Sequence, residues 1–414
     1  TTPETFTKST PAYFMDKAQR KYIYDIQGGE DGKKLYDAVQ KAIDKAKLLA
    51  DVVIGLGHLG VDPSSSPWTS EEVIAHTSGF DAFIDGHSHT VMENKQVQDA
   101  SGKAVTLTQT GSYFANVGEM TIAADGTITT KLIPTHEGMD ATIAAMQTDW
   151  VNTVDDMLGE KIAVGDSDFY VSDPATGKRR IRSAETNLGD FVADGIYTYF
   201  NEVEKLHCDV AIMNGGGIRA DVPAGDWTFK TCKQISPFGN VACLMSVTGK
   251  QIQDALEFAA RFAGEGGKEN GGFLQVAGAT YEIHTDIPNT VQTDEKNVWI
   301  GSATGTPRVQ NVKIYDKASG SYLPLDPGAT YALAGMNYTL RNLGDGFAMF
   351  DGAELIKDYV SEDYLVMSTY AMIFDGADAA GLPHLSSANS PLAAYPGYPL
   401  NYEQPYGAGR ITIL

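Results

Sequence analysis

The chain has 414 residues and a formal net charge of −22, and 43% of its residues are hydrophobic. This size and composition are typical of a folded protein of two or three domains. The acidic excess argues against nucleic acid or an anionic membrane as a partner, and it means that an anionic substrate needs a local cationic pocket or a metal. The three cysteines have no CxxC spacing, which excludes a disulfide scaffold. The sequence contains no apolar run of about 18 residues, so it predicts no membrane-spanning helix.

The first third of the chain alternates predicted helices and strands, whereas residues 1–11 show no element of their own. Apolar residues at helical spacing predict a helix, and short β-branched runs predict strands. In chain order we expect a helix over 35–50, a strand over 52–56, a helix that begins after Thr69, and strands over 80–84, 105–110, 117–122 and 127–132. This alternation is typical of layered α/β folds.

Three histidines directly follow two of these strands. His58 comes after the run 52–56, and His87 and His89 come after the run 80–84, with glycines beside them. Side chains two residues apart on an extended backbone point to the same side, and ligands gather at the carboxyl ends of strands in α/β folds. Because neutral imidazole is the commonest metal ligand, the pattern predicts that His58, His87 and His89 share one metal centre. The other histidines lack this context and are interpreted as ordinary polar side chains: His76, His136, His207, His284 and His384.

A helix is predicted between about residues 138 and 159, where Ile143, Met146, Trp150 and Val154 follow one another at steps of three or four. It separates two regions of different pattern. We therefore interpret it as a connector between domains, although an ordinary domain helix fits the pattern nearly as well. The expected organisation is a first domain over 1–137, a linker over 138–164 and a second α/β domain over 165–414.

The second region also alternates helices and strands. The expected helices cover 187–200 and 250–262, and the expected strands cover 209–213, 241–247, 273–276, 280–284, 309–315 and 331–334. Residues 382–406 are rich in Pro, Ser, Tyr and Gly and predict a surface loop. The chain closes on a short β-type run over 410–414.

A buried strand of this region runs into the turn Asn214-Gly-Gly-Gly-Ile-Arg219. Three glycines expose backbone N–H groups to an anion or a ribose, and Arg219 adds a fork that grips phosphate. Arg182 precedes a predicted helix start, which also favours anions. A tight turn without function would look the same, so the turn alone is weak evidence.

Two phenylalanines stand on loops between glycines, in Pro237-Phe238-Gly239 and Gly346-Phe347. Such neighbours bury a ring poorly, which predicts two exposed aromatic platforms. Stacking on a base is worth roughly 1–3 kcal/mol. Each phenylalanine alone is commonly a packing residue, but together with the glycines and arginines the pair favours a nucleotide pocket.

These residues resemble the 5′-nucleotidases. The motifs that carry the resemblance occur in the family's order along nearly the whole chain: Gly57-His58-Leu-Gly60, Gly86-His87-Ser-His89-Thr90, Glu185-Thr-Asn-Leu-Gly189-Asp190, Asn214-Gly-Gly-Gly-Ile-Arg219, Pro237-Phe238-Gly239, Phe273-Leu-Gln-Val-Ala-Gly278, Gly344-Asp-Gly-Phe347 and Gly409-Arg410-Ile411. The Asn-Gly-Gly-Gly-Ile-Arg run is the most specific of them. The resemblance implies an α/β fold: a partial four-layer α/β/β/α metallophosphoesterase sandwich over 1–137, the linker helix, and a 5′-nucleotidase C-terminal substrate-binding domain over 165–414.

The resemblance also implies roles for single residues. In a site with two divalent metal ions (Zn, Mn or Co), His58 and His87 resemble ligands of one ion and His89 a ligand of the other. The residues that match the family's substrate contacts are Arg182 and Arg219 for phosphate or ribose, Asn214 and Gly216 for the nucleoside, Phe238 and Phe347 for the two faces of the base, and Asp351 for the ribose.

Part of the family pattern is missing. The family's site needs an Asp-x-His near the N-terminus, a Gly-Asp, and an Asn-His followed by an Asp. The only Asp-x-His here is Asp85-Gly-His87, and no Asn-His occurs. Three imidazoles without carboxylates do not hold two divalent cations about 4 Å apart. We therefore expect that about 200 residues, the size of a domain, are supplied separately, as an N-terminal fragment that stays docked. The catalytic acid/base residues are then outside this chain, which alone is expected to be inactive.

The function expected from the resemblance is metal-dependent hydrolysis of a nucleoside 5′-phosphate to nucleoside and phosphate, in an extracellular or periplasmic location. One rival is a nucleotide-binding surface protein without turnover. Another keeps the fold but changes the ester to a cyclic nucleotide, a nucleotide sugar or a thiosulfonate on a carrier.

Overall fold

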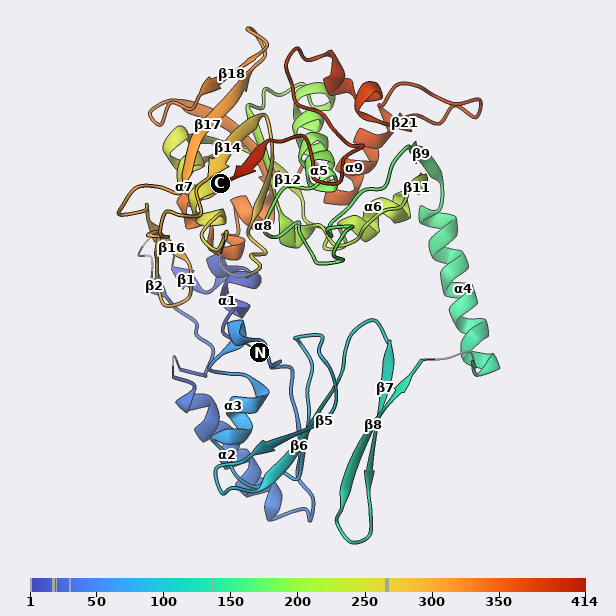
Figure 1. The fold of residues 1–414 in the computed structure, drawn as a ribbon, viewed down its shortest axis with the longest axis vertical. Coiled ribbons are helices and arrows are strands. Elements are labelled where there is room, and N and C mark those ends of the chain that lie inside the picture. The colour runs from blue at the N-terminus through green and yellow to red at the C-terminus, as the bar shows by residue number, and fades with distance from the viewer. Residues whose placement is uncertain (1, 17–18, 20, 30, 136–137, 265–267) are drawn as a thin grey trace. The chain divides into compact units, whose positions relative to one another are not determined.

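The computed structural model describes residues 2–16, 19, 21–29, 31–135, 138–264 and 268–414 (Figure 1). The chain divides into two compact units, residues 1–9 with 14–144 and residues 10–13 with 145–414. His136, interpreted above as an ordinary histidine, lies outside the described residues. Among the helices described, none is both long and apolar enough to cross a bilayer.

The first unit is built on a four-stranded mixed sheet. Its strands lie in the order β3 (Ile54–Leu56), β4 (Ala82–Ile84), β6 (Ala104–Thr110) and β5 (Val91–Gln98). The first three run parallel, and β5 is antiparallel to β6. Because β3 and β4 are parallel neighbours, the loops that follow them emerge at the same end of the sheet.

Two helices cover the apolar face of this sheet. α2 (Lys33–Lys47) and α3 (Ser70–Ala75) pack Ile43 and Val73 into one cluster with Phe83. Thr69 caps α3 in the predicted position and forms a capping box with Glu72. The remaining elements of this unit are α1 (Thr5–Lys8), β1 (Met15–Asp16), β2 (Lys21–Tyr22) and the hairpin of β7 (Asn116–Ile122) and β8 (Ile128–Pro134). The N-terminal segment, expected to be without an element, therefore contains a short helix.

Strand β3 leaves one edge of the sheet open. It is the terminal strand in the described sheet, and its apolar side chains are uncovered: Ile54 is 38% exposed and Leu56 is 83% exposed. Gly55 between them is buried, and a Cβ there would lie 2.3 Å from the ring of Phe83. An open parallel edge with exposed apolar side chains is a surface that other β-structure readily covers.

The second unit is built on a five-stranded sheet whose inner strands are buried on both faces. Its strands lie in the order β13 (Leu274–Ala277), β10 (Val210–Asn214), β19 (Thr330–Met336), β12 (Ala242–Thr248) and β20 (Glu354–Lys357). Alternate residues of β10 enter different clusters: Ala211 and Met213 pack with α5 (Asn187–Thr198), whereas Ile212 packs with α7 (Gly249–Ala259). A strand buried on both faces reads as a continuous apolar run, as β10 does.

The other elements of the second unit extend this core. A four-stranded sheet contains β18 (Ser321–Pro324), β17 (Val309–Asp316), β14 (Ala279–Ile283) and β22 (Ile411–Ile413), and a three-stranded sheet contains β11 (Gly225–Thr228), β9 (Lys161–Gly165) and β21 (His384–Leu385). The remaining helices and strands are α6 (Phe229–Ile235), α8 (Asn337–Leu340), α9 (Asp363–Met372), β15 (Gln292–Thr293) and β16 (Trp299–Gly301).

The helix predicted as a connector forms as α4 (Ala141–Leu158), and none of its residues is buried. Its apolar stripe includes Trp150, which is 66% exposed, and Met157, which is 72% exposed. The domain boundaries proposed from the sequence stay a prediction.

A buried ionic network fixes the carboxyl-terminal segment. Arg410 is fully buried, and its Nη1 and Nη2 donate to Asp194 Oδ1 and Oδ2 at 2.8 and 2.7 Å. Glu185 accepts the backbone N–H groups of Gly409 and Arg410 on Oε1, at 2.9 and 3.1 Å, and that of Ile411 on Oε2, at 2.7 Å. Burial opposes the charge of Arg410, but the neighbouring carboxylates raise its pKa. This network places β22 parallel to β14.

The prediction of a surface loop over 382–406 holds only in part, because a few of its residues enter the core. Leu392 and Tyr402 are fully buried there, and the hydroxyls of Tyr398 and Tyr402 donate to Asp194 at 2.8 and 2.7 Å. The sequence did not indicate these core residues, because the segment is rich in turn residues and has no periodic apolar pattern. Its buried tyrosines instead place their hydroxyls against a charged residue of α5.

Candidate functional site

The structure brings two of the three predicted metal-binding histidines together in the first unit. His58 follows β3 and His87 follows β4, and their ring centroids lie 5.1 Å apart at an interplanar angle of 67°. Asp85 ties the two loops to each other and to β6: its Oδ1 accepts from the N–H of Leu59 at 2.9 Å, and its Oδ2 accepts from Gln109 Nε2 at 3.3 Å. The parallel pairing of the strands therefore explains why these imidazoles meet.

A carboxylate that the sequence did not point to lies against His87. Glu4 Oε1 is 2.9 Å from His87 Nε2, and this hydrogen bond raises the pKa of His87. Burial raises the pKa of Glu4, but hydrogen bonds with His87 and Ser65 outweigh it and leave that pKa below its usual value. Glu4 is 83 residues away in a polar segment, and no pattern in the sequence signals the contact.

His89 and His87 both have a left-handed backbone, with φ of 55° and 78°. Residues other than glycine hold this conformation at a cost, and such strain gathers at functional sites. The ring of His89 lies 6.3 Å from that of Tyr113.

These residues fit only part of a metal site. The described residues contain no group of three or more His, Cys, Asp or Glu placed to hold a metal ion. The donor types are suitable, since imidazole and carboxylate accept Zn, Mn or Co, but the described residues alone do not complete the centre. The three-histidine centre stays a prediction.

In the second unit, the triple-glycine turn does not offer free amides as predicted. The N–H of Gly215 donates to Phe273 O and that of Gly216 to Gly271 O, both at 2.7 Å. The glycines are needed for close packing instead: a Cβ on Gly215 would lie 2.3 Å from Ile181 O, and one on Gly217 would lie 2.5 Å from Met213 Cε. The expectation of an open backbone cradle was therefore wrong for Gly215 and Gly216.

The turn nevertheless joins two of the sequence motifs. Asn214 is 5% exposed, and its Nδ2 donates to Asp345 Oδ2 at 3.2 Å. Asp345 belongs to Gly344-Asp-Gly-Phe347 and has a positive φ of 55°. Asp351 is half-buried a short distance along the chain, and its N–H donates to Ala348 O at 3.2 Å. The proposed contacts of Asn214, Gly216 and Asp351 with a nucleoside stay predictions.

Two guanidinium groups pair with one carboxylate, and a third acts electrostatically on one of them. Arg179 Nε lies 2.8 Å from Glu269 Oε2, and Arg182 Nη1 lies 3.8 Å from the same oxygen. Burial and the charges of Arg179 and Arg219 lower the pKa of Arg182 to about 10. The Nε of Arg182 is buried with no hydrogen-bond partner among the described residues. Like charges held together in this way favour the binding of an anion.

The two predicted aromatic platforms differ completely. Phe238 is 59% exposed, and the guanidinium carbon of Arg219 lies 5.7 Å from its ring centroid. Phe347 is fully buried, with its ring edge-on to Phe258 at 5.1 Å and stacked with Phe350 at 6.3 Å. The prediction of an exposed ring was wrong for Phe347. The neighbouring glycines do allow a loop, but segments distant in sequence pack over that loop and bury the ring.

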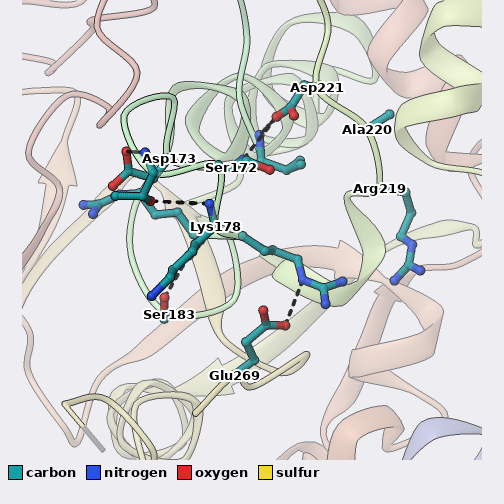
Figure 2. Close-up of a pocket in the computed structure, with 13 residues that line it drawn as sticks. Ser172, Asp173, Lys178, Ser183, Arg219, Ala220, Asp221 and Glu269 are labelled. Carbon is teal, nitrogen blue, oxygen red and sulfur yellow. Dashed lines mark hydrogen bonds and ion pairs between the residues drawn. The ribbon is translucent and has the colours of Figure 1, made fainter. Parts of the chain in front are cut away.

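A pocket of about 940 Å³ opens beside Arg219 (Figure 2). Of the predicted substrate residues it contains Arg219 alone. Its charged lining consists of Lys178, Arg179, Arg180 and Arg219, with Asp173, Asp221 and Glu269. The carboxylates are engaged within the protein: Asp221 accepts the N–H groups of Val171 and Ser172, Asp173 accepts that of Ala175, and Glu269 pairs with Arg179. The sequence analysis missed this wall apart from Arg219, although the basic run Lys178-Arg-Arg-Ile-Arg182 could have signalled it.

Comparison with known proteins gives consistent relatives. Residues 163–352 match the family described as 5′-nucleotidase, C-terminal domain. The chain is 28% identical over 380 residues to the trifunctional nucleotide phosphoesterase protein YfkN of Bacillus subtilis (strain 168), covering 89% of this chain and 22% of that protein. It is 26% identical over 366 residues to the 5′-nucleotidase of Mus musculus, covering 80% of this chain and 58% of the relative.

Among solved structures, the 5′-nucleotidase precursor of Thermus thermophilus matches with a TM-score of 0.62 and 23% identity, over 92% of this chain and 67% of that one. This likeness confirms the predicted α/β fold. The assignment of the first unit to a metallophosphoesterase domain stays a prediction. The chain spans less than two thirds of the length of the mouse enzyme and less than a quarter of that of YfkN. Residues 163–352 thus match the 5′-nucleotidase C-terminal domain family, and the chain as a whole is similar to 5′-nucleotidases.

Proposed function

We propose that this chain supplies the nucleotide-binding domain, and part of the metal site, of an enzyme that hydrolyses nucleoside 5′-phosphates to nucleoside and phosphate. The observation that carries the proposal is the cluster of Arg179, Arg182 and Arg219, of which the first two share the carboxylate of Glu269. Arg219 in turn lies beside the exposed ring of Phe238. The relatives named above are nucleotide phosphoesterases and 5′-nucleotidases.

The arginine cluster suits a phosphate group. Arg182 remains charged at neutral pH, since its pKa of about 10 lies well above 7. A phosphate would offset the mutual repulsion of the guanidinium groups and give the unpartnered Nε of Arg182 an acceptor. The chain carries a net charge of −22, so an anionic ligand needs a local excess of cations such as this one.

The nucleoside part would extend from this cluster towards Phe238. An exposed ring offers one face to a base, and Asn214 and Asp351 carry polar groups suited to a nucleoside. Since Phe347 is buried, the proposal assigns base stacking to Phe238 alone, and Phe347 supports the loop from inside the core.

For the metal site, we assign the imidazoles of His58, His87 and His89 to two divalent ions, Zn, Mn or Co. When bound, such ions activate water and stabilise charge on the phosphate. The remaining ligands and the acid/base residues would come from an N-terminal segment, in the same or a separate chain. The uncovered edge of β3, with Leu56 83% exposed, is a suitable docking surface for it. An extracellular or periplasmic location is part of this proposal.

A nucleotide-binding protein without turnover is the second candidate. It is favoured by the absence, among the described residues, of a group of three potential metal ligands. Hydrolysis of a cyclic nucleotide or a nucleotide sugar would use the same domain.

Calorimetric titration of the chain with AMP and with adenosine tests the binding half of the proposal. We expect AMP to bind at least about tenfold more tightly, because a charge-assisted phosphate contact is worth about 1.5–3 kcal/mol. Equal affinities, or no binding of either ligand, would overturn it. Phosphate release from AMP with Mn²⁺ or Zn²⁺, measured with and without the proposed N-terminal segment, then separates the enzyme from the binding protein: release only when the segment is present supports the enzyme.

A further inference from the structure

Arg182 lies in a loop between β9 and α5 that has no regular structure of its own. The backbone carbonyls on either side of it are held from another element. Gln275, in the middle of β13, donates its Nε2 hydrogens to Ile181 O at 3.0 Å and to Ala184 O at 2.9 Å. The carbonyl of Arg182 itself accepts the N–H of Asn270 at 3.0 Å. The backbone around this arginine is thus fixed by long-range contacts.

The Gln275 side chain has only one orientation that satisfies these contacts. Carbonyl oxygens accept and never donate, so both bonds require the amide nitrogen on this side. The side chain is fully buried. Its Oε1 faces Gly189, where a Cβ would lie 2.3 Å away. Gly189 therefore makes room for the amide, and the amide in turn holds the loop.

The triple-glycine turn packs on the same loop from a second direction. A Cβ on Gly215 would lie 2.3 Å from Ile181 O, which is one of the two oxygens that Gln275 holds. Three sequence motifs, those of Gln275, Gly189 and Gly215, therefore meet at the backbone that carries Arg182.

We propose that Gln275 is a positioning residue for substrate phosphate: it acts through the loop 181–184 to aim the guanidinium group of Arg182. The inference rests on the proposed function, in which Arg182 contacts phosphate. It adds that the affinity gained from phosphate depends on an amide that does not itself contact the ligand.

The test compares AMP with adenosine, which lacks the phosphate. Gln275→Met keeps the length of the side chain and removes both donors. We expect the affinity for AMP to fall about tenfold, because two buried hydrogen bonds are lost, and the affinity for adenosine to change less than about twofold. Loss of both affinities in equal measure would show a general structural role and overturn the inference. Gln275→Glu, which donates one hydrogen at most, is the second variant in case Gln275→Met does not fold.

A double-mutant cycle with Arg182→Met checks the route of the effect. If Gln275 acts through Arg182, Gln275→Met causes no further loss of AMP affinity in the Arg182→Met background, whereas an additive loss contradicts the inference. Asn201→Leu is the matched control, since the Asn201 amide also donates to two carbonyls, Tyr197 O and Cys208 O, both at 3.0 Å, and we expect it to leave both affinities unchanged. Failure of the unsubstituted chain to bind AMP would instead reject the proposed function, so the two failures are distinct.

Discussion

Arg410 and Arg182 lie in the same unit and are both largely removed from water, but the charges around them differ. Arg410 is enclosed by carboxylates that raise its pKa, whereas Arg182 faces two other guanidinium groups and has a pKa lowered to about 10. When a buried charge is paired, removing either partner strongly destabilises the fold. A buried charge beside like charges costs stability and is typical of a binding site. We therefore expect Arg410 to stabilise the fold and Arg182 to bind a ligand.

The largest test of this contrast is Arg410→Met. Removing one partner of a buried pair leaves Asp194 uncompensated, so we expect the second unit to lose about 3–5 kcal/mol of unfolding free energy. Urea unfolding followed by circular dichroism measures it. Arg341→Met is the control, because Arg341 pairs with Asp358 in a partly exposed position, and we expect a cost below about 1 kcal/mol. Similar costs for the two variants would remove the distinction.

Phe347→Ala tests whether the buried ring stabilises the fold or is available to a ligand. We expect a loss of about 3 kcal/mol, since the side chain is fully buried and its removal leaves a cavity beside Phe258. Thermal unfolding measures the effect. A variant with unchanged stability would show that the ring is available to a ligand, as the sequence had suggested.

In Asp363, as in Arg182, burial shifts the pKa towards the neutral form of the side chain. Burial raises its pKa to about 6, despite hydrogen bonds from the N–H groups of Tyr364 and Asn240. A raised carboxyl pKa means that the folded state binds the proton more tightly. Its contribution to stability is therefore present below about pH 4 and lost as the pH rises from about 4 to about 6, by at most about 3 kcal/mol. Asp363→Asn should flatten this part of the pH–stability curve, and an unchanged slope would contradict the assignment.

Arg182→Met should show the reverse of Arg410→Met. We expect stability to change by less than about 1 kcal/mol, because repulsion from Arg179 and Arg219 is relieved while packing is retained. The affinity for AMP should fall by about 2 kcal/mol, near thirtyfold. Calorimetry and urea unfolding of the same sample measure both quantities. A stability loss as large as that of Arg410→Met would show that Arg182 is also needed to stabilise the fold.

The smallest expected effect belongs to Phe238→Ala. Loss of one stacking face should weaken AMP and adenosine equally, by about 1 kcal/mol or fivefold. The ring is 59% exposed, so stability should stay within about 0.5 kcal/mol. Weakening of AMP alone would place the base elsewhere and leave Phe238 as a partner of Arg219.

Regular elements with a local pattern could be predicted from the sequence. The helices α2, α5 and α7 and the buried strands β10 and β12 formed within a few residues of the expected ranges, because their apolar periodicity is visible in short windows. α9 had not been expected. Its buried residues Val366, Met367 and Tyr370 leave no clear polar face, so its pattern does not show the helical period.

The chemistry of the site could be anticipated only where the residues are close in sequence. Arg182 before α5 and the histidines after β3 and β4 were singled out, since a helix start and strand ends mark them. The contacts Glu4–His87 and Gln275–Ala184 span 83 and 91 residues, and a single sequence does not record such pairings. The burial of Phe347 was missed for the same reason, because distant segments cover it.

The hydrogen bond from the Ile411 amide to Glu185 closes a loop of 226 residues. Helix α5 is therefore synthesised long before Arg410, the residue that neutralises Asp194. The five-stranded sheet likewise cannot form completely until the late strands β19 and β20 have been synthesised. The second unit cannot complete its core during synthesis until residues up to 413 have emerged from the exit tunnel. Such non-local closure slows folding and leaves the nascent domain open to chaperones and proteases for most of its synthesis.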